Sequence, residues 1–291
     1  MADGTLRFDG EGLRDAAGAP VDWPALAVLG DPVAHSLSPV LHAAALRARR
    51  IEHAYRAIHV EAEHLGAALV AMGVAGVIGC NLTVPHKKAG IAACARVSDE
   101  VREIGATNTL VRRHDAWTGH NTDARGLALA LQSWRGRALH RAVGRVAVIG
   151  AGGSARAAVV CARALGARRI DVYARRPERA AWAKAFGAEV RSLAPDAAVP
   201  ATLVLQCTPL GLRPDDDPSP VSLDAVDDDA LAVDLTYADR PSAFLRAAAA
   251  RGLESIDGRL MLVGQAALAF SMWFGAQPPV EVMARAIGLE D

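Results

Sequence analysis

The sequence predicts an α/β protein with two domains. Short apolar runs alternate with longer helical patterns along the chain, as strands and helices do in an α/β fold. The 291 residues are enough for two domains. Near the middle, an apolar run breaks into a glycine-rich turn and then into Ala-rich helical sequence. This third observation predicts a parallel sheet bordered by helices.

The first half of the chain alternates predicted strands and helices. Residues 1–24, rich in Gly, Asp and Ala, look like a loose lead-in. Apolar runs bounded by turn residues predict strands over 25–29, 55–60, 76–82 and 109–112. Helical spacing predicts helices over 39–50, 63–72, 87–95 and 123–134. The last of these helices links to the second half of the chain.

The second half opens with the glycine-rich turn. A buried strand over 145–149 would end at the turn, where Gly150 permits the tight bend and Gly152 lets the backbone approach a pyrophosphate. The helix that follows would point its unpaired N–H groups at the phosphates, with Ala155 close to the sheet. A generic strand-to-helix turn looks similar, but a further strand over 169–174 favours a dinucleotide site. Its expected binding residues are Gly150, Gly152, Gly153, Ser154 and Ala155. Apolar runs at 202–206 and 231–235 predict two more strands of this sheet.

The end of the second strand distinguishes the two nicotinamide cofactors. An NAD site usually has an acidic residue there, but the strand ends in Ala174 followed by Arg175 and Arg176. These two residues and Arg179 could bind a 2′-phosphate, so we expect NADP. The alternative is that the arginines only cover a solvated helix start.

The composition excludes several classes of protein. The 32 Lys and Arg residues balance 32 Asp and Glu residues, which leaves no electrostatic footprint for nucleic acid. The apolar stretches are too short or too interrupted for a membrane span, and the first four residues lack the basic region and apolar core expected of a signal peptide. Four cysteines without a C-x-x-C pair predict reduced thiols, and the histidines lack zinc-binding spacing, so we expect no metal. We therefore expect a cytoplasmic protein with a small-molecule substrate, either a monomer or a homodimer.

Polar clusters interrupt the predicted elements of the first half. Ser36 and Ser38 precede Pro39, so Ser38 could cap a helix, or the two hydroxyls could bind a small carboxylate. Asn81, Thr83 and Lys87 stand at or just after the end of a buried strand, where ligands usually bind in such sheets. Turn-forming sequence also occurs at 105–109 and at 119–123. The second segment ends in Asp123, which could be a site residue or simply the cap of the next helix.

Six motifs in order resemble the shikimate dehydrogenase family from about residue 25 to the C-terminus. They are Ser-x-Ser-Pro, Asn-x-Thr-Val-Pro-x-Lys, Ala-x-Asn-Thr, Asn-Thr-Asp, Gly-Ala-Gly-Gly and Asp-Gly…Met-Leu-Val-x-Gln-Ala. The resemblance implies a substrate domain over 25–122 and 258–291, to which the C-terminal helices return. It also implies a doubly wound, Rossmann-type NADP domain over 123–257, and an active site in the cleft between the domains. The implied reaction is the reversible reduction of 3-dehydroshikimate to shikimate.

The resemblance also implies roles for individual residues. Ser36 and Ser38, with Tyr237, would hold the substrate carboxylate, and Lys87 and Asp123 would be the catalytic pair. The ring hydroxyls would be bound by Asn81, Thr83, Asn108 and Gln265. Thr208 belongs to a nucleotide-facing segment over 206–211, and Gly258 to the loop that faces the nicotinamide.

Two departures from the family pattern leave alternatives. Arg259 and Leu260 stand where Leu and Gly are usual, and Ala174 stands where an Asn is common. Relatives of the family act on quinate or an aminoshikimate with NAD. A protein that binds NADP without turnover, as a sensor, is a further alternative. The presence of both Ser36 and Ser38 favours shikimate.

Overall fold

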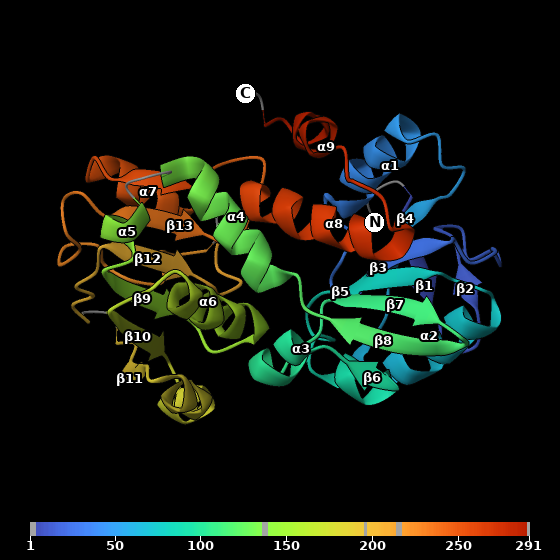
Figure 1. Ribbon diagram of the computed structural model, residues 1–291, viewed down its shortest axis with the longest axis horizontal. Helices are drawn as coiled ribbons and strands as arrows, with labels where there is room; N and C mark the ends of the chain where they lie inside the picture. Colours follow the sequence, from blue (N-terminus) through green and yellow to red (C-terminus); the bar gives the residue numbers. More distant parts are fainter. Residues whose placement is uncertain (1–3, 136–138, 195–196, 214–216, 290–291) are drawn as a thin grey trace. The chain divides into compact units, whose positions relative to one another are not determined.

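The computed structural model describes residues 4–135, 139–194, 197–213 and 217–289 (Figure 1). The chain divides into two compact units. One comprises the residues up to Thr122 and those from Gln265 onward, and the other runs from Asp123 to Gly264. Each unit contains a sheet with helices around it, so the predicted α/β class is confirmed.

The first unit is built on an eight-stranded mixed sheet. Its strands are β1 (Leu6–Phe8), β2 (Leu13–Arg14), β3 (Leu26–Gly30), β4 (Tyr55–His59), β5 (Gly79–Leu82), β6 (Arg96–Val97), β7 (Thr109–Arg113) and β8 (Ala116–His120). The order across the sheet is β2-β1-β4-β3-β5-β7-β8-β6. The central strands β4, β3 and β5 are parallel, and β7 and β8 continue the sheet in antiparallel pairs.

The centre of this sheet is apolar because helices cover it. All five residues of β3 are buried, which is typical of a central parallel strand. Leu29 and Ile58 pack there with Leu69 and Met72, so each contributes about 1.5–3 kcal/mol by leaving water. The helical elements of this unit are α1 (Ser38–Ala48), η1 (Ala62–His64), α2 (Leu65–Val74), η2 (Ala89–Ala93), α3 (Asp99–Ile104), α9 (Val280–Ala286) and the last part of α8 (Arg259–Phe274).

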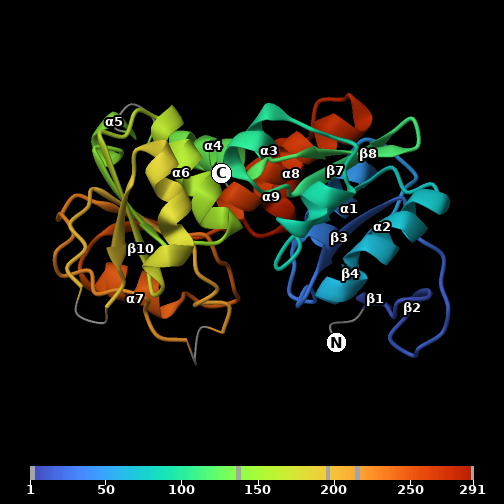
Figure 2. The same cartoon turned by 90° about the horizontal axis from the view of Figure 1, so that it is seen from below.

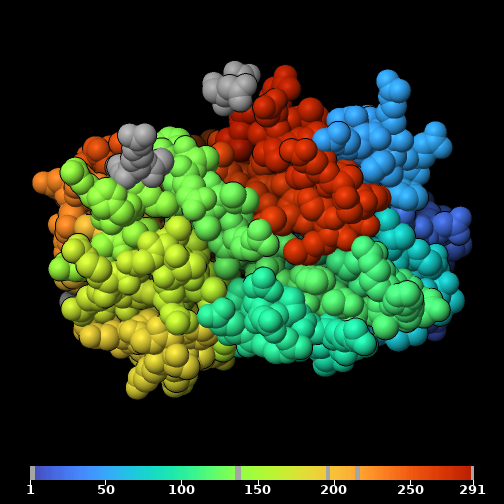
Figure 3. Space-filling model, in the orientation of Figure 1, coloured from blue at the N-terminus to red at the C-terminus, as the bar shows by residue number. Residues whose placement is uncertain are grey.

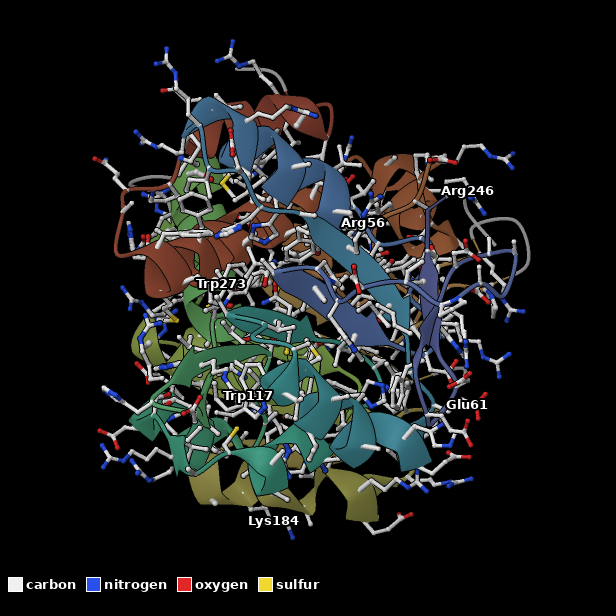
Figure 4. All side chains as sticks on the ribbon, turned by 90° about the vertical axis from the view of Figure 1, so that its right-hand side faces the viewer. Arg56, Glu61, Trp117, Lys184, Arg246 and Trp273 are labelled. Atoms are coloured by element: carbon white, nitrogen blue, oxygen red, sulfur yellow. The ribbon has the colours of Figure 1, made fainter. Side chains whose placement is uncertain are left out.

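The C-terminal helices complete this unit. Helix α9 packs against α1, and the C-terminal segment (red) lies beside the α1 region (blue) in Figure 3. Trp273, near the end of α8, lies over the sheet and donates through Nε1 to the carbonyl oxygen of Leu110 on β7 at 3.1 Å (Figure 4). Gly79 opposite has no side chain, because a Cβ there would lie 2.1 Å from that nitrogen. The C-terminal residues thus belong to the same core as β5 and β7.

The N-terminal segment differs from the expected loose lead-in. Its strand β1 pairs in parallel with β4, placing Leu6 opposite Ile58, and β2 pairs with β1. Phe8 is buried and lies 5.7 Å from the ring of Trp23. Strands of two and three residues are too short to give an alternating pattern, so the sequence did not indicate them. The expected helix over 87–95 is likewise shorter, a 3-10 helix over Ala89–Ala93.

The second unit is a doubly wound parallel sheet. Its strands are β9 (Arg145–Ile149), β10 (Arg169–Ala174), β11 (Glu189–Ser192), β12 (Leu203–Gln206), β13 (Leu231–Asp234) and β14 (Glu254–Ile256). The order is β11-β10-β9-β12-β13-β14, and every pair is parallel. This order reverses direction at β9, which is the Rossmann arrangement that the glycine-rich turn predicted.

Helices cover both faces of the second sheet. They are α4 (Asp123–Arg135), α5 (Leu139–Ala142), α6 (Gly153–Ala164), η4 (Pro177–Phe186) and α7 (Ala243–Ala250). Connections between parallel strands are right-handed, and the chain moves across the sheet in opposite directions from β9 to β10 and from β13 to β14. Helices α6 and α7 therefore lie on opposite faces (Figure 2). Among the described helices, none combines the length and the apolar character needed to cross a membrane.

Candidate functional site

Asn81 lies at the carboxyl end of β5 and is held by three hydrogen bonds. Its Nδ2 donates to the carbonyl oxygen of Asn108 at 3.1 Å and to Oγ1 of Thr109 at 3.0 Å. Its Oδ1 accepts a hydrogen bond from the hydroxyl of Tyr55 at 2.8 Å. The amide is buried, so these bonds fix its position.

Asn108 continues the same set of bonds. Its Oδ1 accepts from the backbone N–H of Thr122 at 2.8 Å, and its Nδ2 donates to Oγ1 of Thr122 at 2.9 Å and to Oε1 of Gln265 at 3.5 Å. Oγ1 of Thr109 donates to Oδ1 of Asn108 at 3.1 Å. We call the six residues Tyr55, Asn81, Asn108, Thr109, Thr122 and Gln265 the amide–hydroxyl network.

The network brings together three residues named from the sequence and three that were missed. Asn81, Asn108 and Gln265 were expected at a substrate site. Thr109 and Thr122 stand inside the Ala-x-Asn-Thr and Asn-Thr-Asp motifs, and that position could have indicated them. Tyr55 opens a strand 26 residues before Asn81, and nothing in the local sequence signals its contact.

The two serines lie at the start of α1. Ser38 is buried as the first helical residue, and the N-cap position is occupied by Leu37 without a side-chain hydrogen bond. The expectation that Ser38 caps the helix is therefore wrong. Instead, the hydroxyl of Ser36 accepts a bond from the backbone N–H of Ser38 at 3.3 Å, the local turn that serine forms in competition with capping.

A tight turn connects Asn81 to Lys87. The N–H of Thr83 donates to the carbonyl of Leu29, and the N–H of His86 donates to the carbonyl of Thr83. His86 also donates from Nε2 to the carbonyl of Val60 at 2.8 Å; burial lowers the pKa of its buried ring, which favours the neutral form. The carbonyl of the half-buried Lys87 accepts from the N–H of Thr107 at 2.7 Å. The backbone that carries Lys87 is therefore fixed on both sides.

Asp123 is the first residue of α4 in the second unit. It is buried and directly follows Thr122 of the amide–hydroxyl network. A carboxylate in the first turn of a helix interacts favourably with the helix dipole. Lys87 and Asp123 thus lie in different units.

The glycine-rich turn has the geometry that close phosphate approach requires. Gly150 has φ +118°, and a Cβ there would lie 3.3 Å from atoms of Cys207 and Thr208, so a larger residue would be strained. Gly152 is the N-cap of α6, and a Cβ there would meet no atom within 4 Å. The first turn of α6, with Gly153 and Ser154, therefore begins beside open space. Ala155 is fully buried, as expected for a residue against the sheet.

The arginines after β10 are exposed. Arg175, Arg176 and Arg179 all follow the carboxyl end of the strand. The acidic residue of this strand, Asp171, is engaged elsewhere, because it accepts from Arg169 at 2.8 Å and from Arg191 at 2.7 Å. Burial opposes the charge of Asp171, but the two arginines outweigh burial and lower its pKa. Within the described part of the chain, β10 thus ends without a carboxylate available for a ribose hydroxyl.

A buried carboxyl group organises the other loops of the second unit. Asp234, at the end of β13, accepts from the N–H and the hydroxyl of Thr236 at 2.9 and 2.8 Å and from the hydroxyl of Ser242 at 2.5 Å. Nε2 of Gln206 donates to the same carboxyl at 3.3 Å. Burial raises the pKa of Asp234. We call Asp234, Gln206, Thr236 and Ser242 the Asp234 cluster, which the sequence interpretation missed.

The Asp234 cluster is joined, by hydrogen bonds or by adjacency in the chain, to three segments that the sequence analysis named. Oε1 of Gln206 accepts from the N–H of Thr208, which fixes that segment. Half-buried Tyr237 directly follows Thr236. Gly258 donates its N–H to the carbonyl of Thr236 at 3.0 Å, and a Cβ on Gly258 would lie 2.5 Å from the carbonyl oxygen of Leu235. One carboxyl group therefore holds the loops of Thr208, Tyr237 and Gly258.

Comparison with known proteins identifies the family. Residues 28–110 match the shikimate dehydrogenase substrate binding domain, and residues 258–287 match the shikimate 5′-dehydrogenase C-terminal domain. The chain is 37% identical to shikimate dehydrogenase (NADP(+)) from Synechocystis sp. over 279 residues, which cover 90% of this chain and 94% of that protein. The chain belongs to the shikimate dehydrogenase family. Among shikimate dehydrogenases it is also 37% identical to the NADP(+) enzyme from Bacillus licheniformis, over 89% of this chain and 95% of that protein.

Solved shikimate dehydrogenases share the fold. The shikimate 5-dehydrogenase from Thermus thermophilus, solved in complex with NADP(H) and shikimate, matches with a TM-score of 0.79 and 37% identity. The match covers 90% of this chain and 97% of that chain. The resemblance drawn from six motifs is therefore confirmed over most of the sequence.

Proposed function

We propose that this protein is an NADP-dependent oxidoreductase that reversibly reduces 3-dehydroshikimate to shikimate, a step of aromatic amino acid biosynthesis. The observation that carries the proposal is the buried amide–hydroxyl network, which contains Asn81, Asn108 and Gln265. Amides and hydroxyls both donate and accept hydrogen bonds, so they match the several hydroxyls of a small ring. The Synechocystis and Bacillus relatives, both named shikimate dehydrogenase (NADP(+)), support the same substrate and cofactor.

We propose that the substrate is bound by two sets of residues. The hydroxyls of Ser36, Ser38 and Tyr237 bind its carboxylate, with Ser36 and Ser38 aided by the nearby N-terminus of α1. Asn81, Thr83, Asn108 and Gln265 bind its ring hydroxyls. In this proposal the residues up to 122 and those at the C-terminus form the substrate domain, and the doubly wound sheet forms the NADP domain.

The proposed chemistry needs a proton donor at the ketone oxygen. Bound NADPH supplies the hydride that forms the new C–H bond. As the C=O π bond breaks, Lys87 gives a proton to the oxygen, where negative charge grows, and is reprotonated from solvent. Asp123 holds the ammonium of Lys87 and accepts from the neighbouring ring hydroxyl. The two together form the proposed catalytic pair.

The second unit fits NADP. Gly150, Gly152, Gly153, Ser154 and Ala155 would receive the pyrophosphate at the N-terminus of α6, where backbone N–H groups are unpaired. Arg175, Arg176 and Arg179 would bind the 2′-phosphate, and Thr208 and Gly258 would contact the nucleotide and nicotinamide. The engagement of Asp171 by two arginines supports NADP over NAD.

We further propose that the protein acts in the cytoplasm as a monomer or a homodimer. Its four cysteines are free, and burial raises the pKa of the Cys94 thiol to about 11 and that of the Cys161 thiol to about 12. Burial also raises the pKa of Cys80 and Cys207. Unpaired, protonated thiols suit a reducing compartment.

A spectrophotometric assay tests the function. Purified protein is mixed with shikimate, and reduced cofactor is followed at its absorbance maximum with NADP and NAD in parallel and quinate as the control substrate. Shikimate-dependent reduction that prefers NADP supports the proposal. Faster turnover of quinate, or a preference for NAD, would assign the protein to a sister activity. Binding of NADP without turnover of either acid would identify a sensor.

A further inference from the structure

The orientation of the Asn81 amide follows from its partners. Its Nδ2 lies 3.1 Å from the backbone carbonyl oxygen of Asn108, which can only accept a hydrogen bond. The atom that faces this carbonyl must therefore be the nitrogen. The second Nδ2 hydrogen points to Oγ1 of Thr109, which itself donates onward to Asn108. Both donors of Asn81 are thus used inside the protein.

The same orientation defines what the oxygen of Asn81 can do. Oδ1 has two lone pairs, and one of them accepts from the hydroxyl of Tyr55 at 2.8 Å. Among the residues that the structure describes, no other donor reaches this oxygen. Asn81 can therefore offer a ligand one acceptor and no donor.

Tyr55 is held by aromatic packing. Its ring stacks on His42 with a centroid distance of 4.3 Å and an interplanar angle of 19°. The ring centroid of Trp273 lies 6.0 Å from that of Tyr55 and 5.1 Å from that of His42. His42 is completely buried, and burial lowers its pKa to about 3, so the ring beside Tyr55 is neutral. Packing fixes the place of the tyrosine hydroxyl without introducing a charge.

We infer that Tyr55 is a positioning residue that holds Asn81 as a hydrogen-bond acceptor for one of the ring hydroxyls that the reaction leaves unchanged. The tyrosine hydroxyl and the substrate hydroxyl both donate to Oδ1 of Asn81. The site consequently selects a hydroxyl at that ring position over a group that cannot donate. This inference rests on the proposed function, because it assumes that Asn81 binds the ring.

The inference is tested first with the wild-type protein. The substrates are shikimate and two analogues, each with fluorine in place of one of the two ring hydroxyls that are not oxidised, because fluorine is small and cannot donate a hydrogen bond. At one ring position, the replacement should lower kcat/KM about tenfold, mainly through KM. If both analogues reacted within about twofold of shikimate, the acceptor role of Asn81 would be overturned.

The second measurement uses Tyr55→Phe, with Tyr173→Phe as the matched control. Tyr173 is a buried tyrosine of the other unit, so the control also removes one buried hydroxyl. Tyr55→Phe should raise KM for shikimate about tenfold and leave KM for NADP unchanged. The penalty for fluorine at the sensitive position should shrink to about threefold or less, because the two losses concern the same oxygen.

The outcomes separate the two proposals. A fluorine penalty that is equally large in Tyr55→Phe would overturn the positioning role of Tyr55 while leaving the proposed function intact. Wild-type protein that does not oxidise shikimate at all would overturn the proposed function, and this inference with it. The analogue series needs no variant, so it decides the role of Asn81 even where Tyr55→Phe does not fold.

Discussion

The two units differ in the charge of the polar groups at the carboxyl ends of their strands. In the first unit, the carboxyl end of β5 carries the amide–hydroxyl network, in which every member is neutral. In the second unit, the carboxyl end of β13 carries Asp234, a buried carboxyl group bound by hydroxyl, amide and backbone donors. Among the ion pairs that the described residues form, none includes Asp234.

The neutral network and the buried carboxyl group are suited to different roles, one to substrate binding and the other to stability. A neutral network keeps its hydrogen bonds at any pH where the protein is folded, which suits recognition of an uncharged ring. A buried carboxyl group strengthens each bond that it accepts but is costly when it loses a partner. We therefore expect mutations in the amide–hydroxyl network to act mainly on substrate affinity and mutations in the Asp234 cluster to act mainly on stability.

The largest effect is expected from replacing Lys87, the cation that the proposed site requires in the first unit. Lys87→Met keeps the methylene stem and removes the ammonium. We expect kcat to fall by a factor of about 10² to 10⁴, as for a lost proton donor, with a smaller change in KM for shikimate. Steady-state kinetics measures both. Lys88→Met, at the exposed neighbour, is the control. Near-normal turnover of Lys87→Met would remove Lys87 from the mechanism.

The next effect concerns His42, the buried base of the first unit. Its folded pKa of about 3 lies below its ordinary value of 6.5. The unfolded state therefore binds the proton more tightly, and stability is lost as pH falls below about 6.5. At about 1.4 kcal/mol per pH unit, His42 contributes a loss of about 3 kcal/mol between about pH 6.5 and about pH 4.

His42→Phe keeps the aromatic stack and removes the titrating ring. Urea unfolding at about pH 7 and about pH 4.5 should show a smaller loss of stability in the variant than in wild type. His53→Phe, at an exposed histidine of the same unit, should keep the wild-type slope. Equal slopes in all three proteins would mean that other groups, such as His86, account for the acid instability.

The third effect concerns Asp234, the buried carboxyl group of the second unit. Asp234→Asn has the shape of the carboxyl group but turns an NH₂ group toward donors such as Ser242. We expect a loss of about 2 kcal/mol in the free energy of unfolding and a higher KM for NADP, because the loops of Thr208 and Gly258 loosen. Chemical denaturation and cofactor titration measure the two effects.

Asp227→Asn, at an exposed carboxylate of the same unit, is the control for Asp234→Asn. The pH dependence has the opposite sign from that of His42. Because burial raises the folded pKa of Asp234, its protonation favours the folded state, and Asp234→Asn should remove a stabilisation that grows as pH falls. Unchanged stability at neutral pH would show that the loops do not depend on this carboxyl group.

Much of the fold was predictable because its signals are local. The run from Arg145 to Ala155 combines a buried strand, a left-handed glycine and a helix start within eleven residues, and the structure has all three. The strands of the N-terminal segment were not predicted, because they are short and depend on pairing with β4, far away in the sequence. Tertiary pairing determines such elements, and local periodicity does not.

The candidate site was predictable only in part for the same reason. Asn81 and Asn108 stand out as polar residues at strand ends, so their type and place are informative together. Tyr55 and Asp234 act through partners in other elements, and a tyrosine or an acid at the edge of an apolar run has many ordinary explanations. The cap at Ser38 was predicted from residue type, whereas the hydroxyl of Ser36 makes the local bond instead.

The buried thiols give each unit its own built-in probe. Cys80 lies in β5 next to Asn81, Cys161 lies in α6, the helix that follows the glycine-rich turn, and both thiols are buried in the folded chain. A thiol reagent can reach either one only when the surrounding element opens, so its labelling rate reports the population of that opened form. The labelling rates of Cys80 and Cys161 therefore report local opening in the first and second units separately, in one sample of the unmodified protein.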